Sequence, residues 1–191
     1  MLPVMSIPAR RRMSADEFLD WAMAQPEGAR YELVAGEVVA MPPERAVQGR
    51  TKLAAFDALR AAVAEAGLSC EAFIDGMAVR VDDGTVYEPD VLLRCGPPVP
   101  DDCVEIRDPV IVVEVLSPSS TSRDTGGKLD DYFRIPAVRH YLIVKTANRT
   151  VIHHRRDEAG EVQTRILREA TLALEPPGLA LDVAFLFPPR L

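Results

Sequence analysis

The segment 110–116, with the sequence VIVVEVL, is the most apolar stretch of strand length in the chain. A continuous apolar run of this kind is typical of a strand that is buried on both faces. We therefore expect this strand at the centre of a sheet. A helix over about 124–133 and a strand over 141–144 are predicted to follow it. The order strand, helix, strand favours an α/β domain built around residues 110–116.

Shorter elements are predicted on both sides of this centre. Ser14 and Glu17 form a capping-box pattern, which predicts a helix that ends near residues 26–28. Two apolar runs around Ala35 and Gly36 predict a β-hairpin over 31–41. Alternating patterns predict the remaining strands, at 71–74, 77–81, 86–93, 151–154 and 162–167.

A long helix is predicted over about 44–66, in an alanine-rich part of the chain. Leu53, Phe56, Leu59 and Val63 recur at helical spacing and are expected to form its buried face. Gly67 can adopt the left-handed conformation that commonly ends a helix.

Length and composition favour one globular domain of 191 residues, 48% of them hydrophobic. No apolar run reaches the roughly 18 residues that a membrane helix needs, and the N-terminus lacks a secretory signal pattern. The net charge of −7 argues against a broad surface for nucleic acid, because phosphate backbones bind positive surfaces. It leaves room for a local site whose carboxylates are neutralised by a metal ion.

The three cysteines, Cys70, Cys95 and Cys103, contain no CxxC pair and cannot all pair with one another. Free thiols in a reducing cytosol are the simplest interpretation, and we expect a cytoplasmic protein.

Glu114 is the charged residue inside the most apolar strand. Side chains alternate along a strand, so Val112, Glu114 and Leu116 are expected on one face of the sheet. Burying a carboxylate is costly unless a cation or a donor meets it. Glu114 is therefore either one half of a structural salt bridge or a ligand of a hard metal ion such as Mg²⁺.

Asp90 and Lys128 are the other two residues that could carry chemistry. Asp90 follows Pro89 at the start of the strand 91–93, where a plain turn aspartate is the alternative interpretation. Lys128 lies on the helix after the Glu114 strand and shares a face with Tyr132, four residues further on. An exposed lysine is its alternative; a lysine over the strand end could bind a phosphate oxygen or orient an attacking water.

An aspartate at one strand, a glutamate within the next apolar strand and a nearby lysine resemble the PD-(D/E)xK nuclease superfamily. The chain is most similar to the bacterial Uma-two family of restriction-type endonucleases. The segments that carry this resemblance are YELVAGEVV (31–39), YEPDVLL (87–93), DPVIVVEVLSPSS (108–120), KLDDY (128–132) and VRHYLIV (138–144). Together they span roughly residues 14–187.

The resemblance implies an α/β (α+β) fold with a restriction-endonuclease-like core. A mixed central sheet flanked by helices would follow an N-terminal helix and hairpin. Residues 14–191 would form this single domain, after a flexible extension over residues 1–13.

The resemblance also implies roles for individual residues. Asp90, Glu114 and the carbonyl of Val115 would bind Mg²⁺ or Mn²⁺. Leu116 stands where the superfamily lysine is expected, and Lys128 would be its substitute from the helix. Glu32 would complete the catalytic set, or be a surface residue of the hairpin. Tyr132 would support the site or simply pack.

Two segments depart from the family pattern. Val47-Gln48 stands where a histidine-glutamine pair is common, and the strand from Tyr141 ends in Lys145 where an aspartate is common. Neither departure removes a proposed metal ligand.

The three histidines do not predict a zinc site. His153 and His154 are adjacent on a strand and should point to opposite faces, while His140 has no partner in the sequence. We interpret all three as structural or surface residues.

The leading hypothesis is a metal-dependent endonuclease that hydrolyses DNA phosphodiester bonds. A catalytically weak or inactive nuclease-fold module, binding nucleic acid or a protein partner, is the main alternative. A metal-dependent hydrolase of another phosphoester is a third. No membrane partner is expected, and a homodimer is compatible with double-strand cutting.

Overall fold

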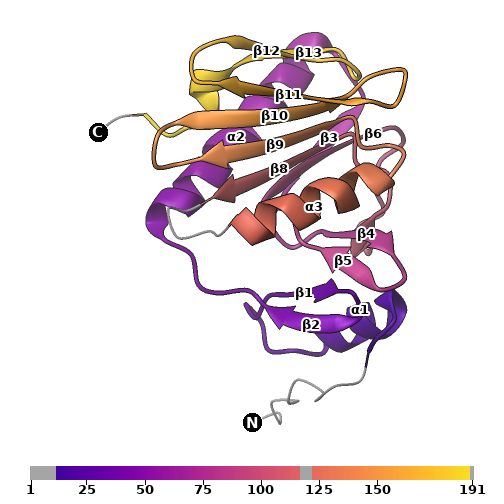
Figure 1. Ribbon diagram of the computed structural model, residues 1–191. Helices are drawn as coiled ribbons and strands as arrows, with labels where there is room; N and C mark the ends of the chain where they lie inside the picture. The colour runs from indigo at the N-terminus through magenta and orange to yellow at the C-terminus, as the bar shows by residue number, and fades with distance from the viewer. Residues whose placement is uncertain (1–11, 117–121, 190–191) are drawn as a thin grey trace.

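The computed structural model describes residues 12–116 and 122–189, and all structural statements refer to them (Figure 1). Its helices are α1 (Ala15–Met23), α2 (Ala46–Ala66), α3 (Ser122–Arg134) and a final 3-10 turn, η1 (Val183–Leu186). Its strands are β1 (Tyr31–Val34), β2 (Glu37–Ala40), β3 (Cys70–Ile74), β4 (Ala78–Asp82), β5 (Thr85–Tyr87), β6 (Val91–Cys95), β7 (Glu105–Ile106), β8 (Ile111–Leu116), β9 (His140–Lys145), β10 (Thr150–Arg156), β11 (Val162–Leu167), β12 (Thr171–Leu174) and β13 (Leu179–Asp182).

A six-stranded sheet forms the centre, in the order β11-β10-β9-β8-β6-β3. The apolar strand β8 lies inside it, as its composition predicts. Strands β8 and β9 are parallel and are connected through α3, whereas the other neighbours are antiparallel. The sheet is therefore mixed, as the family resemblance of the sequence implies.

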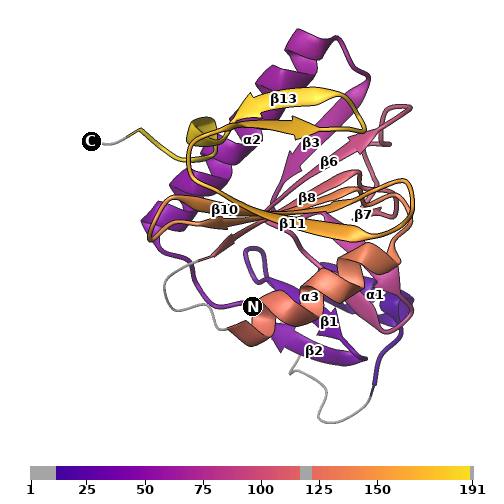
Figure 2. The ribbon, with the colours of Figure 1, turned by 45° about the horizontal axis from the view of Figure 1, so that its top comes forward.

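The two faces of the six-stranded sheet are covered differently (Figure 2). Helix α2 and the β12–β13 hairpin pack on the face that carries Val113 and Val115. Helix α3 and strands of a second sheet pack on the face that carries Val112. The predicted alternation along β8 is confirmed, and it directs Glu114 toward the side covered by α3.

The second sheet has five strands, in the order β2-β1-β5-β4-β7, and packs against α1. The capping box of α1 is present: the Glu17 amide donates to the Ser14 hydroxyl, and Glu17 accepts from the Ser14 amide. Only residues 12 and 13 of the predicted N-terminal extension are described, and the Met13 amide donates to the Gly36 carbonyl.

The predicted strand over 86–93 is in fact two strands in different sheets. β5 ends at Tyr87 and β6 begins at Val91, with Glu88, Pro89 and Asp90 between them. Proline cannot donate to a strand ladder, which explains a break at this point. The break lets residues 88–90 pass from the five-stranded to the six-stranded sheet.

Helix α2 forms over nearly the predicted range and ends at Gly67, whose φ is 62°. Its predicted buried face is partly wrong. Leu53 is 53% exposed, whereas the neighbouring Lys52 is only 1% exposed and lies on the same stripe as Ala55 and Leu59. Among the described helices, none is long and apolar enough to span a membrane.

The prediction of three free thiols is wrong. Cys70 and Cys95 are opposite each other in the β3–β6 ladder and form a disulfide. Their separation of 25 residues hides this pairing in the sequence. Cys103 is a free thiol.

Candidate active site

Antiparallel pairing of β6 with β8 brings Asp90 and Glu114 to the same end of the central sheet. Val91 is paired with Val113, so Asp90 and Glu114, the next residues toward that end of the two strands, lie opposite each other. The backbone amide of Val115 donates a hydrogen bond to Asp90 Oδ2. Both carboxylates are buried, with 5% and 8% of their residue surfaces exposed.

Lys128 reaches the same point from α3. Its Nζ lies 3.0 Å from Glu114 Oε1 and 2.8 Å from Glu32 Oε1. Glu32 is buried on β1 and also accepts a hydrogen bond from the Glu88 amide. The interpretations of Lys128 and Glu32 as surface residues are therefore wrong, because both side chains face inward.

Two tyrosines complete the surroundings of Glu114 and Lys128. The Tyr132 hydroxyl donates to Glu114 Oε1 at 2.8 Å, and its ring is fully buried beside Tyr87 and Tyr141. The ring centroid of Tyr87 lies 4.9 Å from the Lys128 ammonium, within the range of a cation–π interaction. Tyr132 thus both packs and supports the carboxylate.

Burial raises the pKa of both carboxyl groups. Desolvation, followed by the nearby charge of Glu114, raises the pKa of Asp90 to about 7. Desolvation also raises the pKa of Glu114, although Lys128 opposes this shift. Glu114 thus adds to the proton affinity of Asp90, and Glu32 adds to that of Glu114, so an additional positive charge is favourable beside these buried carboxylates.

Lys128 is held as a cation. Burial alone would lower the pKa of its ammonium group, but Glu114 and Glu32 outweigh that effect and raise it. A lysine with a raised pKa cannot serve as a proton acceptor near neutral pH. Its chemical capacity is therefore to contribute a fixed positive charge.

A second group of charged side chains adjoins Asp90. Lys52 Nζ lies 2.7 Å from Asp90 Oδ1 and 2.8 Å from Asp75 Oδ1, and it also contacts Glu44. Arg30 pairs with Glu44 and Asp75, and with Glu88 at 2.7 Å. The carboxylate Asp90 therefore connects the Lys52 group to the Glu114 group.

The donor atoms fit a hard divalent cation. Carboxylate and backbone oxygens are the ligands that Mg²⁺ and Mn²⁺ prefer, and Asp90 and Glu114 supply two buried carboxylates at adjacent strand positions. A bound cation would offset the effects of burial and of the nearby Glu114 charge, which together raise the pKa of Asp90. Asp90, Glu114 and the Val115 carbonyl are the groups that would hold it.

The sequence and the fold are similar to those of known proteins. Residues 15–184 match the family described as "Uma2: Putative restriction endonuclease". The chain belongs to the Uma2 family. An uncharacterized protein of Synechocystis sp. is 26% identical over 182 residues, which cover 92% of each chain.

A crystal structure from Anabaena variabilis, described as a "putative nuclease belonging to DUF820", has the same fold. Its TM-score is 0.71 with 16% sequence identity, over 92% of this chain and 97% of that one. The expected restriction-endonuclease-like fold is therefore confirmed, as is the resemblance to the Uma-two family.

Part of the Uma2 motif lies outside the described residues. This part covers positions 117–120 of the segment 108–120, together with Thr121 before α3. Of the departures from the family pattern, Val47 is 38% exposed on the first turn of α2, and Lys145 ends β9 opposite Leu116.

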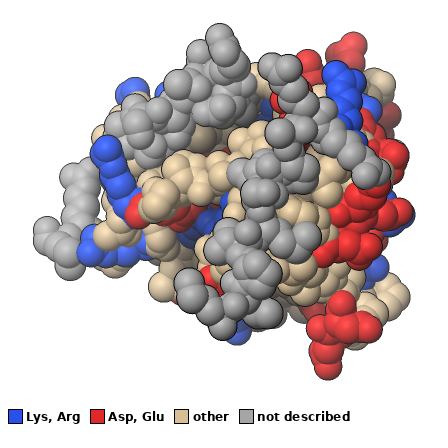
Figure 3. Space-filling view, turned by 90° about the horizontal axis from the view of Figure 1, so that it is seen from below, with Lys and Arg blue, Asp and Glu red and all other residues tan. Residues whose placement is uncertain are grey.

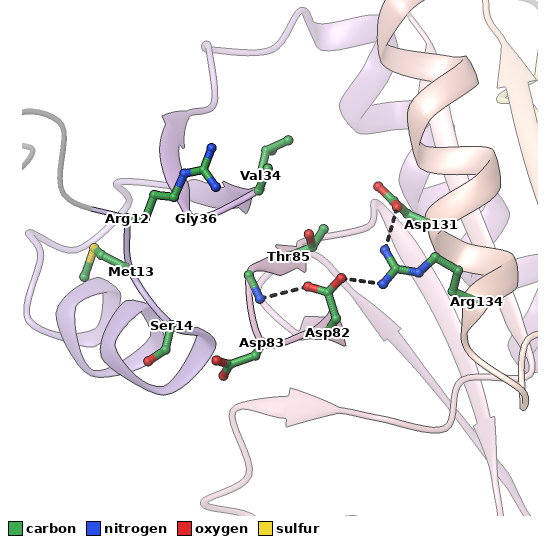
Figure 4. Close-up of a pocket in the computed structure, with 12 residues that line it drawn as sticks. Arg12, Met13, Ser14, Val34, Gly36, Asp82, Asp83, Thr85, Asp131 and Arg134 are labelled. Atoms are coloured by element: carbon green, nitrogen blue, oxygen red, sulfur yellow. Dashed lines mark hydrogen bonds and ion pairs between the residues drawn. The ribbon is translucent and has the colours of Figure 1, made fainter.

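A cavity of about 570 Å³ lies away from Asp90 and Glu114 (Figure 4). The β1–β2 turn, the β4–β5 turn and α3 line it, and Arg134 pairs there with Asp82 and Asp131. None of the predicted site residues lines this cavity. The chemistry of the buried carboxylates, rather than the size of a hollow, identifies the candidate site.

The charge on the surface does not form a broad basic face in the view from below. Asp and Glu side chains gather along one side of that face, whereas Lys and Arg side chains are more scattered (Figure 3). This distribution agrees with the net charge of −7. Positive charge at the candidate site is local, supplied by Lys128, Lys52 and Arg30.

The histidines form a separate group and are buried, not on the surface. His140 Nδ1 and His153 Nε2 are 2.9 Å apart, and His140 Nε2 lies 2.9 Å from the Pro176 carbonyl oxygen. His154 instead contacts the Thr164 hydroxyl. The structure supplies the partner for His140 that the sequence does not reveal.

The structure brings together all the side chains singled out in the sequence: Asp90, Glu114, Lys128, Glu32 and Tyr132. Sequence reasoning missed Lys52, Tyr87 and Glu88. The signal for Lys52 was present, because residues 52, 55, 59, 62 and 63 follow helical spacing and form the buried stripe of α2. A lysine within such a stripe indicates a buried charge with a partner.

Proposed function

We propose that this Uma2 protein is a Mg²⁺- or Mn²⁺-dependent endonuclease that hydrolyses DNA phosphodiester bonds. The observation that carries the proposal is the buried pair Asp90 and Glu114 beside the cationic Lys128. Membership of a family of restriction-type endonucleases agrees with this chemistry. DNA as the substrate, the metal and the residue roles are parts of the proposal.

The proposed roles follow from charge and position. Asp90, Glu114 and the Val115 carbonyl would hold the divalent ion, which would supply polarisation of the scissile phosphate and activation of water. Lys128 contributes positive charge toward the phosphate as negative charge develops on it. Glu32 positions Lys128, and Tyr132 orients Glu114 through its hydroxyl.

The test is cleavage of supercoiled plasmid DNA in Mg²⁺ or Mn²⁺. Asp90→Asn and Glu114→Gln keep the side-chain shape and remove the charge, so each should lower the rate by about a hundredfold or more. Asp108→Asn is the matched control, because Asp108 pairs with Arg94 and is half exposed. Equal cleavage by all four proteins would assign the activity to a contaminant and reject the proposal.

A nuclease-fold module without catalysis is the second candidate. The observation that favours it is that Lys52 and Lys128 already neutralise much of the carboxylate charge. This candidate predicts no heat of Mn²⁺ binding in calorimetry and no cleavage. The endonuclease proposal instead predicts Mn²⁺ binding that is weakened in Glu114→Gln.

Cutting both strands requires two sites, and a homodimer would supply them. Sedimentation of the protein with and without a DNA duplex tests this part of the proposal. A monomer in both conditions that still linearises plasmid DNA in one step would contradict it.

A further inference from the structure

Lys52 is a buried ammonium group at the centre of three carboxylates. Its residue surface is 1% exposed, and its Nζ contacts Glu44, Asp75 and Asp90. One oxygen from each of these carboxylates lies within 4.8 Å of the other two. The ammonium thus stands where three oxygen ligands converge.

A positive charge is needed at this point. Six carboxylates, Glu32, Glu44, Asp75, Glu88, Asp90 and Glu114, share three cations, Arg30, Lys52 and Lys128. Without Lys52, three carboxylates would face one another, with Asp90 deeply buried. Such a set of oxygens is stabilised by an ammonium group or by a hard divalent cation.

We propose that Lys52 takes the place of a second divalent cation beside Asp90, so that the protein binds one divalent ion per chain. This inference rests on the proposed function, because the first ion is the one held by Asp90 and Glu114. In two-metal nuclease sites the ions lie about 3.5–4 Å apart and flank the reacting phosphate. Here Asp90 is the carboxylate between the two positions.

Lys52 is accordingly a positioning residue that acts through Asp90. Its ammonium holds Asp90 Oδ1, while the Val115 amide holds Oδ2. The carboxylate is therefore fixed from both sides before any divalent ion arrives. Unlike a second metal ion, this charge neither dissociates nor depends on metal concentration.

The stoichiometry of Mn²⁺ binding tests this inference, measured by titration calorimetry and by electron paramagnetic resonance of the bound ions. The wild-type protein should bind one Mn²⁺. Lys52→Met should bind two, with a spin-coupled Mn²⁺ pair. Arg80→Met is the matched control, because Arg80 is a largely buried cation between Asp16 and Glu105 and should leave one ion bound.

Lys52→Met can also lose stability, and thermal unfolding with and without Mn²⁺ covers that case. A variant that folds only with Mn²⁺ supports the inference, since the ion then replaces the ammonium. An equal number of ions in Lys52→Met and wild type overturns it. A variant that stays unfolded in both conditions also overturns it.

The proposed function fails by a different result. If wild type binds no Mn²⁺ while Lys52→Met binds one ion, the site of Asp90 and Glu114 is not a metal site. In that case Lys52 would still stand in place of a cation, but the count of one divalent ion per chain would be wrong. If instead wild type and Lys52→Met each bind one Mn²⁺, and Glu114→Gln binds none, the metal site of Asp90 and Glu114 is supported and the role of Lys52 is rejected.

Discussion

Two groups of polar side chains are buried against opposite faces of the central sheet. Glu114 lies near the end of β8 on the face of α3, and it is accompanied by Lys128. His140 begins β9 on the other face and contacts His153. The first group contains the charged ammonium of Lys128, whereas the pKa values of both histidines in the second group are lowered and their rings are neutral at pH 7.

The histidine pair satisfies its hydrogen bonds almost entirely without ionisation. Since the Pro176 carbonyl can only accept, His140 Nε2 carries a proton and His140 Nδ1 accepts from His153 Nε2. His153 Nδ1 is the atom left without a partner among the described residues. Burial lowers the pKa of His140 to about 4 and that of His153 to about 3, so both are neutral at pH 7.

Packing and charge are provided by different faces of the central sheet. A neutral pair serves packing, and nothing in its contacts provides a reactive charge. Keeping charged groups in the interior costs desolvation free energy, and an apolar replacement of similar volume is often at least as stable. The buried charges around Glu114 are therefore better explained by a chemical role than by a contribution to the stability of the fold.

The largest expected effect is that of Lys128→Met. Nuclease activity should fall by about a hundredfold, because a charge near the phosphate is lost. The free energy of unfolding should fall by about 3 kcal/mol, because Glu32 and Glu114 lose their buried partner. Plasmid cleavage and urea unfolding measure the two effects.

His153→Leu provides the contrast for Lys128→Met. It should leave plasmid cleavage at the wild-type rate while altering stability, because His153 lies away from the carboxylates. A strong loss of cleavage in His153→Leu, or full cleavage in Lys128→Met, would contradict the division between the two groups.

The next effect is the pH dependence of stability in His153→Leu. The folded pKa of His153, about 3, lies below its unfolded value of 6.5, so the unfolded chain takes up the proton first as pH falls. Wild type should therefore lose about 3 kcal/mol of unfolding free energy relative to His153→Leu between pH 7 and pH 4.

Wild type is compared with His153→Leu because the buried carboxyl groups change stability with pH in the opposite direction to His153. Raised folded pKa values of Asp90 and Glu114 give stability at low pH that is lost as pH rises. This contribution is shared by both proteins and cancels in their difference. A difference that stays constant from pH 7 to pH 4 would show that His153 has the same pKa in the folded and unfolded states.

Much of the Glu114 group could be predicted because its signal is local. A single carboxylate in the strand VIVVEVL stands out from its neighbours, and strand alternation fixes its face. Asp90 was singled out because it follows Pro89 beside an apolar strand, although the break between β5 and β6 was not predicted. The order strand, helix, strand likewise predicted an α/β domain with residues 110–116 at the centre of a sheet, but not the parallel direction of the β8–β9 pair.

Contacts between distant segments could not be predicted in the same way. Cys70 and Cys95 meet only because β3 and β6 are neighbours, and His140 meets His153 only across the β9–β10 hairpin. Strand order, not residue type, decides both contacts. Lys52 was missed for another reason: the apolar side chain of Leu53 predicts a buried position, whereas the adjacent stripe that includes Lys52 is the one that packs.

The smallest effect is expected from Tyr132→Phe, which keeps the buried ring and removes only the hydroxyl. Glu114 would lose a hydrogen bond of 2.8 Å but keep Lys128, so the free energy of unfolding should fall by about 1.5 kcal/mol. Mn²⁺ affinity should weaken only a few-fold, because the carboxylate remains and only its orientation is less restricted. Urea unfolding and titration calorimetry measure these changes.

Tyr141→Phe is the matched control, since the Tyr141 ring packs on Tyr132 and no hydrogen bond joins it to Glu114 in the described chain. It should leave Mn²⁺ affinity unchanged. Equal Mn²⁺ affinity in wild type and Tyr132→Phe would reduce Tyr132 to a packing residue. A loss of Mn²⁺ affinity as large as that of Glu114→Gln would instead mean that the Tyr132 hydroxyl is essential for holding the Glu114 carboxylate. The hydroxyl would then contribute as much to Mn²⁺ affinity as the charge of Glu114.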